Sequence, residues 1–352
     1  MNTDQIHKLL KKEKVESVLI SSTPNIAYIT NYNGFSQIER EAYLLTTHEN
    51  THLITDGRYT NAVKHLSKDL KIHEITSSTS LLKLLEKIIS SENITSLGFE
   101  SDNLTVSEYV KIKKLKIKLK PTSLNNLRVI KSPDEIKRIK KSCDIANKAF
   151  DTTKNEIKAG MSEVEVAWIF EKYVKEQQAE LSFPTIVAFG RNSATPHHLT
   201  SNQKLKIDDT ILIDCGVKYN NYCSDMTRTF SFGKPTEELG KIYKIVEKSQ
   251  QLAIEHIQSL IANHQSIQAS EIDKVARNHI VSQGYSTIPH SLGHGIGIEV
   301  HEAPRLSPTS KDKLEEGMAF SIEPGIYLPE IGGVRIEDLF TIQNNKLIQL
   351  TQ

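Results

Sequence analysis

The sequence of 352 residues is short of cysteine, of excess charge and of long apolar runs. Its three cysteines, Cys143, Cys215 and Cys223, are too few for a disulfide scaffold and fit a reducing compartment. The 44 lysines and arginines nearly balance the 43 aspartates and glutamates, which argues against a protein that mainly binds nucleic acid or anionic membrane. No window approaches the ~18 apolar residues of a membrane span, and the N-terminus lacks the apolar segment of a signal peptide. We therefore expect a cytoplasmic protein with no nucleic-acid or membrane partner.

Glycine and proline are scarce in the first 130 residues, which hold three of the 16 glycines and two of the 11 prolines. Short apolar segments such as Val18–Ile20 and His52–Thr55 alternate there with helical patterns, and the apolar residues of Ser80–Ser90 fall on one helical face. This order is typical of an α/β domain. Because a chain of this length forms about two domains, we expect one at residues 1–125 and a second at residues 126–352.

Residues 111–120, KIKKLKIKLK, are the most basic run of the chain. A nucleic-acid patch is one interpretation. The nearly neutral total charge instead favours a strand whose lysines protect an exposed sheet edge. The segment Pro121–Lys131 is then expected to link the two domains.

Capping signals predict a repeated order of helix, helix and strand in the second domain. Ser132–Glu135 and Ser162–Glu165 are capping boxes, and the first should begin a helix that runs to about Ile157. Thr236 and Ser270 should begin a second pair of helices. A Pro-His dipeptide follows each pair. This faint duplication suggests a functional site between two related halves.

Two aspartates at strand ends are the first candidates for chemistry. Asp214 follows the apolar run Thr210–Ile213, and Asp225 should lie on a strand that returns beside it. Two buried carboxylates that face each other repel, so one must stay protonated unless a cation is present. A divalent metal ion removes that cost.

Three further candidates follow in the sequence. His294 is surrounded by three glycines, which let the backbone come close to a bound group; Glu323 stands at a strand end, and Glu337 stands in a strand beside Arg335. Each of these residues alone is typical of a turn, an edge or a structural position. Together with the two aspartates they form a ligand set of mostly hard oxygens. Such a set suits Mn²⁺, or less distinctively Co²⁺ and Zn²⁺, and two ions rather than one.

Five residues, in this order, resemble the metal ligands of the pita-bread metallopeptidases: Asp214, Asp225, His294, Glu323 and Glu337. That family includes methionine aminopeptidases, prolidases, aminopeptidase P and the metal-free creatinases. The segments Tyr32–Phe35 and Leu53–Tyr59 resemble the creatinase-type N-terminal domain of prolidases and aminopeptidase P, which typical methionine aminopeptidases lack. The resemblance implies an α/β (α+β) fold, with a creatinase-like N-terminal α/β domain followed by a pita-bread catalytic domain that carries the pseudo-twofold duplication.

The resemblance also implies a role for each ligand. Asp214 would bind one metal ion and His294 and Glu323 the other, while Asp225 and Glu337 would bridge both. A hydroxide between the ions would be the nucleophile, and Glu323 would accept the proton of the water from which it forms. All five positions keep a ligating side chain, which argues against a creatinase or another metal-free relative.

Histidines and one arginine around this set match family positions that contact the substrate. His197 matches a catalytic histidine; the adjacent His198 competes for that role, and spacing favours the former. His290 and His301 match two histidines of the substrate pocket, and the second of these is also expected to be catalytic. Arg335 matches an arginine beside the metal site that contacts the substrate.

The implied activity is hydrolysis of an Xaa-Pro peptide bond at a free N-terminus, by an Xaa-Pro dipeptidase or an Xaa-Pro aminopeptidase. Such a bond has no amide N–H, so peptidases that bind this group handle it poorly, whereas two metal ions act without it. Two alternatives remain: an aminopeptidase of this fold with another N-terminal specificity, methionine included, and a non-catalytic protein that retains metal. The ligand set favours two Mn²⁺ ions as the cofactor, with Co²⁺ or Zn²⁺ as alternatives. The resemblance also implies a homodimer.

Overall fold

The computed structural model describes residues 3–351, and the chain divides into two compact units between Arg128 and Val129. This division falls three residues after the expected domain boundary. Within the described residues, no helix combines the length and the apolar character needed to cross a membrane.

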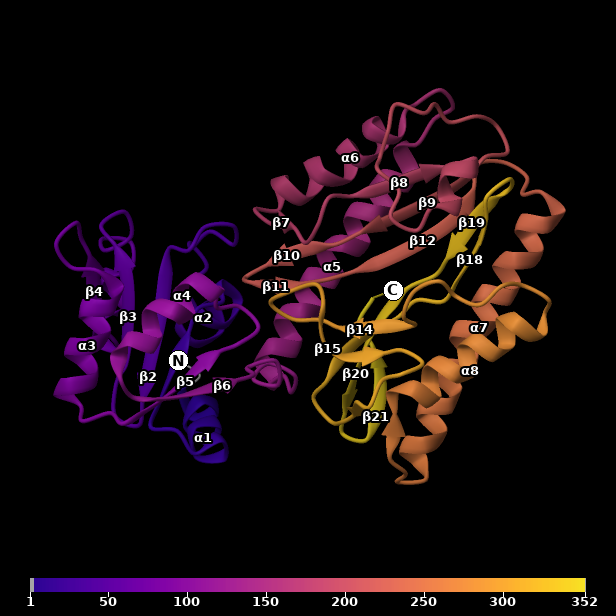
Figure 1. Cartoon of the computed structure of the whole chain (residues 1–352). Coiled ribbons are helices and arrows are strands. Elements are labelled where there is room, and N and C mark those ends of the chain that lie inside the picture. The colour runs from indigo at the N-terminus through magenta and orange to yellow at the C-terminus, as the bar shows by residue number, and fades with distance from the viewer. Residues whose placement is uncertain (1–2, 352) are drawn as a thin grey trace. The chain divides into compact units, whose positions relative to one another are not determined.

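A mixed six-stranded sheet of order β4-β3-β2-β1-β5-β6 forms the centre of the N-terminal unit (Figure 1). Its strands are β1 (Ser17–Ile20), β2 (Ala42–Thr47), β3 (Thr51–Asp56), β4 (Lys71–Ile75), β5 (Ser96–Glu100) and β6 (Lys118–Thr122). Its α-helices are α1 (Thr3–Glu13), α2 (Thr23–Thr30), α3 (Leu81–Ser91) and α4 (Val106–Ile112). Leu85 and Ile88 of α3 pack against Leu19 and Leu45 of the sheet. The strands and the helix expected from the apolar pattern are therefore confirmed.

The basic run 111–120 is only partly the edge strand that the sequence analysis expects. A capping box between Thr105 and Glu108 begins α4, so the first lysines of the run lie at the end of that helix and in the short 3-10 turn Lys113–Leu115. The strand β6 begins at Lys118 and lies at the edge of the sheet. The expectation of one continuous strand is wrong because the local capping signal takes precedence over the alternation of apolar residues.

The C-terminal unit, which begins at Val129, contains two pairs of long α-helices. They are α5 (Pro133–Glu156), α6 (Glu163–Glu176), α7 (Glu237–Ala262) and α8 (Ala269–Ser282). Ser132 and Ser162 form the expected capping boxes with Glu135 and Glu165, and Thr236 caps α7. The last helix differs from the prediction, because α8 begins one residue before Ser270 and its N-cap Gln268 makes no side-chain hydrogen bond.

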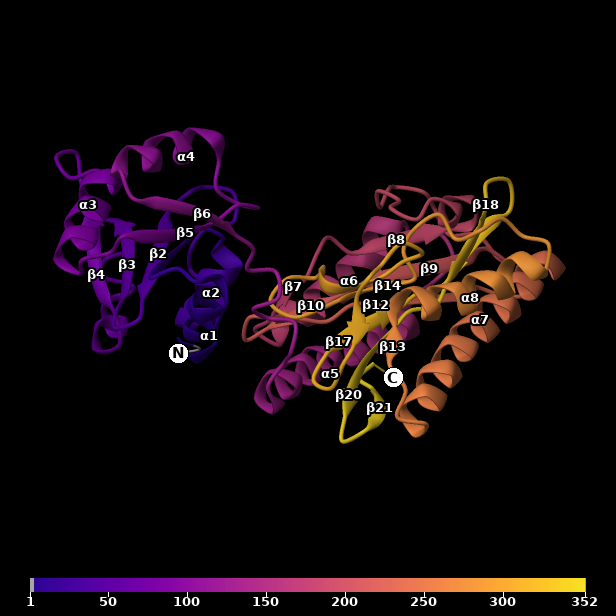
Figure 2. The ribbon, with the colours of Figure 1, turned by 60° about the horizontal axis from the view of Figure 1, so that its bottom comes forward.

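Small antiparallel sheets lie beside these helix pairs. The strands before α7 are β7 (Glu180–Leu181), β8 (Ile186–Phe189), β9 (Thr210–Cys215), β10 (Val217–Tyr219), β11 (Tyr222–Cys223) and β12 (Met226–Ser231). Those after it are β13 (Ile267–Gln268), β14 (Gly293–Gly295), β15 (Glu302–Leu306), β16 (Lys313–Leu314), β17 (Ala319–Ile322), β18 (Gly325–Leu328), β19 (Gly332–Arg335), β20 (Asp338–Gln343) and β21 (Lys346–Gln349). The helix pair α5–α6 shares a core with β8, β9 and β12, and α7–α8 shares one with the sheet β15-β14-β17-β20-β21. Figure 2 shows α7 and α8 side by side along the second sheet. The expected duplication of helix, helix and strands is confirmed.

Candidate metal centre and active site

Strand pairing brings the five expected metal ligands together from both halves of the C-terminal unit. β9 and β12 pair antiparallel with Asp214 opposite Thr227. Asp225 stands just before the returning strand β12 and not on it as expected. His294 lies in β14, and Glu323 follows β17 directly. Glu337 does not lie in a strand as predicted: it stands between β19 and β20, where the chain leaves one sheet to join another.

The glycines around His294 have a different role from the expected one. A Cβ atom at Gly293 would lie 2.0 Å from the carbonyl oxygen of Ser321, and one at Gly295 would lie 2.1 Å from that of Ala303. Both neighbours belong to the chain itself, because β14 lies between β15 and β17. The two glycines therefore allow close strand packing, and no bound group is needed to explain them.

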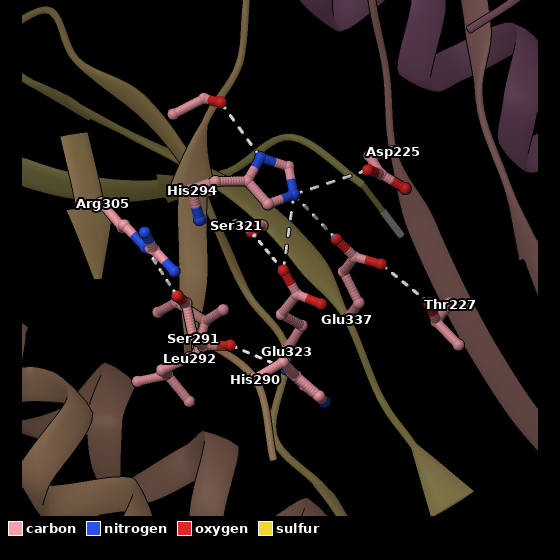
Figure 3. Close-up of polar contacts among 12 residues, drawn as sticks. Asp225, Thr227, His290, Ser291, Leu292, His294, Arg305, Ser321, Glu323 and Glu337 are labelled. Atoms are coloured by element: carbon pink, nitrogen blue, oxygen red, sulfur yellow. Dashed lines mark hydrogen bonds and ion pairs between the residues drawn. The ribbon is translucent and has the colours of Figure 1, made fainter. Parts of the chain in front are cut away.

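A pocket of about 460 Å³ holds these ligands. Its lining includes all five of them together with four other expected site residues: His197, His290, His301 and Arg335. The imidazole Nε2 of His294 lies 3.6 Å from Asp225 Oδ2, 3.4 Å from Glu323 Oε1 and 4.0 Å from Glu337 Oε1. Figure 3 shows these three carboxylates pointing toward the imidazole ring.

Several ligand atoms in this pocket have no hydrogen-bond partner within the described residues. They are Asp214 Oδ1, Asp225 Oδ1 and Glu337 Oε1, all buried. Asp225, His294 and Glu337 also each offer an atom within 4.8 Å of the other two. Buried carboxylate oxygens without donors are costly unless a cation pairs with them. The residues present therefore fit divalent metal ions.

The pKa values of the pocket residues point the same way. Burial, and then the charge of Glu337, raises the pKa of Asp225 well above its usual range. Burial, and then the charge of Asp214, raises the pKa of Glu337 to about 8. Burial lowers the pKa of His294 to about 4, which keeps its imidazole neutral, the form that binds metal. The carboxylates repel one another, and a cation removes that repulsion.

Surrounding groups fix the orientation of the ligands. His294 Nδ1 donates to the carbonyl of Gly295 at 3.0 Å, which leaves Nε2 without a proton and facing the carboxylates. Thr227 Oγ1 donates to Glu337 Oε2 at 2.7 Å, and Ser321 Oγ donates to Glu323 Oε1 at 3.2 Å. Such contacts hold the ligand atoms in place before any metal ion binds.

Arg335 joins Asp214 to a chain of hydrogen bonds behind the pocket. Its Nη2 donates to Asp214 Oδ2 at 2.7 Å and its Nη1 donates to Tyr327 Oη at 3.0 Å. His290 Nδ1 must donate to the Ser291 carbonyl at 2.8 Å, so its Nε2 accepts the Tyr327 hydroxyl proton at 2.9 Å. The guanidinium thus holds an aspartate, and the expected contact of Arg335 and His290 with substrate stays a prediction.

The structure distinguishes the two adjacent histidines. His197 lines the pocket, whereas His198 Nε2 lies 2.8 Å from a carboxylate oxygen of Glu163 outside the pocket lining. The ring of His301 packs edge-on against that of His294, with 4.4 Å between their centroids. Of the two candidates, His197 is placed to reach a bound substrate. Its catalytic role stays a prediction, as does that of His301.

Arg305 and Tyr327 also belong to this site, although neither is among the residues expected from the sequence. Arg305 lies directly opposite His294 in the pairing of β14 with β15, so its side chain is on the same face, and it lines the pocket. Figure 3 shows its guanidinium beside Ser291, to whose Oγ the Nε donates at 2.9 Å. Strand alternation around His294 could have indicated Arg305. No sequence signal indicates Tyr327, because its role depends on contacts between separate strands.

Comparisons with known proteins agree with this geometry. Residues 137–344 match Metallopeptidase family M24, and residues 3–130 match the Creatinase/Prolidase N-terminal domain. The chain is 37% identical to a Xaa-Pro dipeptidase of Pyrococcus horikoshii over 354 residues, with 99% of this chain and 96% of the relative covered.

Two solved structures have the same fold over nearly the whole chain. The Xaa-Pro dipeptidase from Bacillus anthracis superposes with a TM-score of 0.89 at 32% identity, covering 100% of this chain and 97% of the other. The X-Pro aminopeptidase from Thermotoga maritima superposes with a TM-score of 0.86 at 30% identity, covering 98% and 97%. The chain therefore belongs to metallopeptidase family M24, in its pita-bread Xaa-Pro peptidase branch, and is a metallo-exopeptidase that requires divalent metal ions.

Proposed function

We propose that this protein is a dinuclear Xaa-Pro dipeptidase that uses Mn²⁺. The observation that carries the proposal is the pocket in which four carboxylates and one imidazole converge, with buried oxygens that lack donors within residues 3–351. Asp214 would hold one ion, His294 and Glu323 the other, and Asp225 and Glu337 both. Two divalent cations held there would polarise the scissile carbonyl and supply a water-derived nucleophile near neutral pH.

The chain's own residues supply the remaining steps. Glu323 accepts the proton of the attacking water, because its carboxylate lies at the pocket beside His294 and is oriented by Ser321. His197 and His301 also line the pocket, where they would contact the substrate carbonyl and the developing tetrahedral centre. Arg335 orients Asp214 through the 2.7 Å contact between Nη2 and Oδ2.

Tolerance of proline after the scissile carbonyl follows from what this site does not require. The leaving nitrogen of an Xaa-Pro bond is tertiary and has no N–H to offer a peptidase backbone. A pocket that acts on the carbonyl oxygen through charge loses nothing when that N–H is missing. The relatives named as Xaa-Pro dipeptidases and an X-Pro aminopeptidase support this substrate class.

Arg305 favours a dipeptide over a longer peptide. In an Xaa-Pro dipeptide the proline carries the free C-terminal carboxylate, one residue from the scissile bond. Arg305 lines the pocket on the face of His294, and within the described residues its guanidinium forms no ion pair with a carboxylate. A guanidinium binds a carboxylate through strong charge-assisted hydrogen bonds. In a longer peptide that carboxylate is replaced by an amide, and this contact is lost.

Cleavage assays test the proposal. The Mn²⁺-loaded protein should cleave Ala-Pro much faster than Ala-Pro-amide, Arg-Pro-Pro or Met-Ala, and chelation should abolish activity. Arg305→Gln should raise KM for Ala-Pro by about ten- to a hundredfold, since a charged hydrogen bond contributes about 1.5–3 kcal/mol, and should leave Ala-Pro-amide unaffected.

Arg191→Gln is the matched control, because Arg191 is exposed and lies outside the pocket lining. Cleavage of Met-Ala alone would contradict the Xaa-Pro assignment. Equal rates on Ala-Pro and Arg-Pro-Pro would identify an aminopeptidase, and absence of cleavage by metal-loaded protein would identify a binding protein.

A further inference from the structure

The segment that carries His197 connects β8 to β9 and runs around a buried carboxylate. That carboxylate belongs to Glu163, the first residue of α6, whose side chain has no exposed surface. Glu163 lies outside the lining of the metal pocket and contacts none of the expected metal ligands. A buried charge in such a place needs an explanation.

Glu163 accepts five hydrogen bonds, all from the segment 189–201. Its Oε1 accepts from the backbone N–H of Phe189 and from Asn192 Nδ2, both at 2.8 Å. Its Oε2 accepts from His198 Nε2 at 2.8 Å, from the backbone N–H of Ser201 at 2.9 Å and from Ser201 Oγ at 2.6 Å. One carboxylate therefore joins the start of the segment to its end.

The contacts require the charged form of Glu163. Burial by itself raises the pKa of this carboxyl group, but the hydrogen bonds from Ser201 and the other donors bring it below its usual value. The N-terminus of α6 also favours a negative charge at its first residue. A neutral amide at this position could not accept from all five donors.

His197 lies between two residues that are both held in place. On one side, the carbonyl of Pro196 accepts from Arg335 Nη1 at 3.4 Å. On the other side, the ring of His198 is bound to Glu163 at 2.8 Å. Two residues after His198, Thr200 Oγ1 donates to the carbonyl of Thr185 at 2.8 Å. This hydrogen bond connects the end of the segment to the residue directly before β8. The backbone at His197 thus has little freedom, although its side chain is exposed to the pocket.

We infer that Glu163 is a positioning residue of the peptidase, which fixes the segment 189–201 so that the His197 imidazole is held at the metal pocket. The inference rests on the proposed function, in which His197 acts on the substrate. The inference also assigns a role to His198. Its side chain donates to Glu163 and so connects the backbone next to His197 to the buried carboxylate.

Kinetics of two glutamine variants test the inference. Glu163→Gln should lower kcat for Ala-Pro by about ten- to a hundredfold, because small misplacement of a catalytic group has effects of this size, with KM and bound Mn²⁺ near wild type. Glu165→Gln is the matched control: it removes a charge from the same helical turn, and glutamine still completes the capping box with Ser162. The control should keep wild-type kcat.

A double variant separates positioning from general loss of stability. In a His197→Ala background, Glu163→Gln should change kcat less than twofold, because the group that it positions is already absent. An undiminished loss in that background, or a parallel loss of Mn²⁺, would overturn the inference. Should Glu163→Gln fail to fold, His198→Ala and His198→Gln replace it: the alanine should lower kcat, and the glutamine, which can still donate to Glu163, should restore most of it.

A crystal structure gives a readout that does not depend on activity. In Glu163→Gln the segment 190–200 should shift and the His197 ring should leave the position that it has in the wild type; an unchanged ring position would refute the inference. If the wild type cleaves no Xaa-Pro substrate, the proposed function fails, while the ring position still decides whether Glu163 holds His197.

Discussion

The buried carboxylate of Glu163 and the buried carboxylates of the metal pocket, all in the C-terminal unit, have pKa values shifted in opposite directions. Glu163 accepts five hydrogen bonds, and these bring its pKa below the usual value against the effect of burial. At the metal pocket, burial and neighbouring charges raise the pKa of Asp225 and Glu337, and each has an oxygen without a donor within residues 3–351. All of these carboxylates are buried, so the hydrogen-bond donors and charges around them decide the direction of the pKa shift.

A structural carboxylate and a metal-ligand carboxylate differ in the hydrogen-bond partners that the chain provides. The first is satisfied by the chain itself and holds a segment in place. The second is left in need of positive charge, which the chain supplies only in part: Arg335 reaches Asp214 at 2.7 Å, and no such contact is made to Asp225 within the described residues. A metal pocket can therefore be identified by the hydrogen bonds that buried acids fail to make.

Asp225→Asn should have the largest effect on this contrast. The variant removes a charge from the position expected to bridge two ions, so bound metal should fall below two ions per chain and kcat should drop on the order of a thousandfold, since metal supplies several kcal/mol of transition-state stabilisation. In metal-free protein the same change removes repulsion, and the melting temperature should not fall. Metal analysis and calorimetry measure both.

The control for Asp225→Asn is Asp151→Asn, at an exposed position on α5. It should keep wild-type metal content and kcat. Two tightly bound ions in Asp225→Asn would contradict the bridging role. A large loss of stability of the metal-free variant would show that the charge of Asp225 is satisfied by the chain, and the contrast with Glu163 would then fail.

His197→Ala should have the second-largest effect on kcat, and it tests the part of the pocket that is expected to contact the substrate. Within the described residues, His197 forms no hydrogen bond or ion pair with an expected metal ligand, so the variant should bind Mn²⁺ as the wild type does. The kcat for Ala-Pro should fall about a hundredfold, in the usual range for a lost acid–base or oxyanion contact. Metal content and kcat should be measured on the same sample. Equal losses of both would mean that His197 supports the metal ions and not the substrate.

Local signals in the sequence account for much of the fold. Capping boxes at Ser132 and Ser162 give the correct starts of two helices, because a cap depends on residues three positions apart. The same rule explains the error at the basic run: the box of Thr105 and Glu108 begins a helix where alternation suggests a strand. Ser270 fails as a cap because α8 starts before it.

For the candidate site, the sequence predicts the metal ligands better than the residues that support them. The five candidate ligands follow from residue type, order and resemblance, and the structure brings them all into one pocket. The positions of Tyr327 and Glu163 could not be derived in the same way, and only strand alternation around His294 could have indicated Arg305. Each acts through contacts across many residues of sequence, such as the bond of Glu163 to Ser201, and a single sequence does not show which distant donors meet a given acid.

The smallest effect, and the sharpest test of the contrast, is the pH dependence of stability in Glu163→Gln. The pKa of Glu163 is lowered in the folded chain, so the stability that its charge contributes is present above the unfolded pKa of about 4.5 and is lost as pH falls through the folded value. At pH 7 the variant should be less stable by about 1–3 kcal/mol, the usual cost of buried donors left without an acceptor.

That difference should shrink as pH falls below about 4.5, because protonation of the wild-type carboxyl then removes the same contacts. Urea unfolding of metal-free wild type and variant across this range measures it without the stabilisation that bound metal adds. Glu171→Gln, on the same helix, controls for the loss of one negative charge. A stability difference that stays constant with pH would mean that the five hydrogen bonds do not depend on the charge of Glu163. Glu163 and the carboxylates of the metal pocket would then differ in their place in the fold, and their hydrogen-bond partners would not explain their different pKa values.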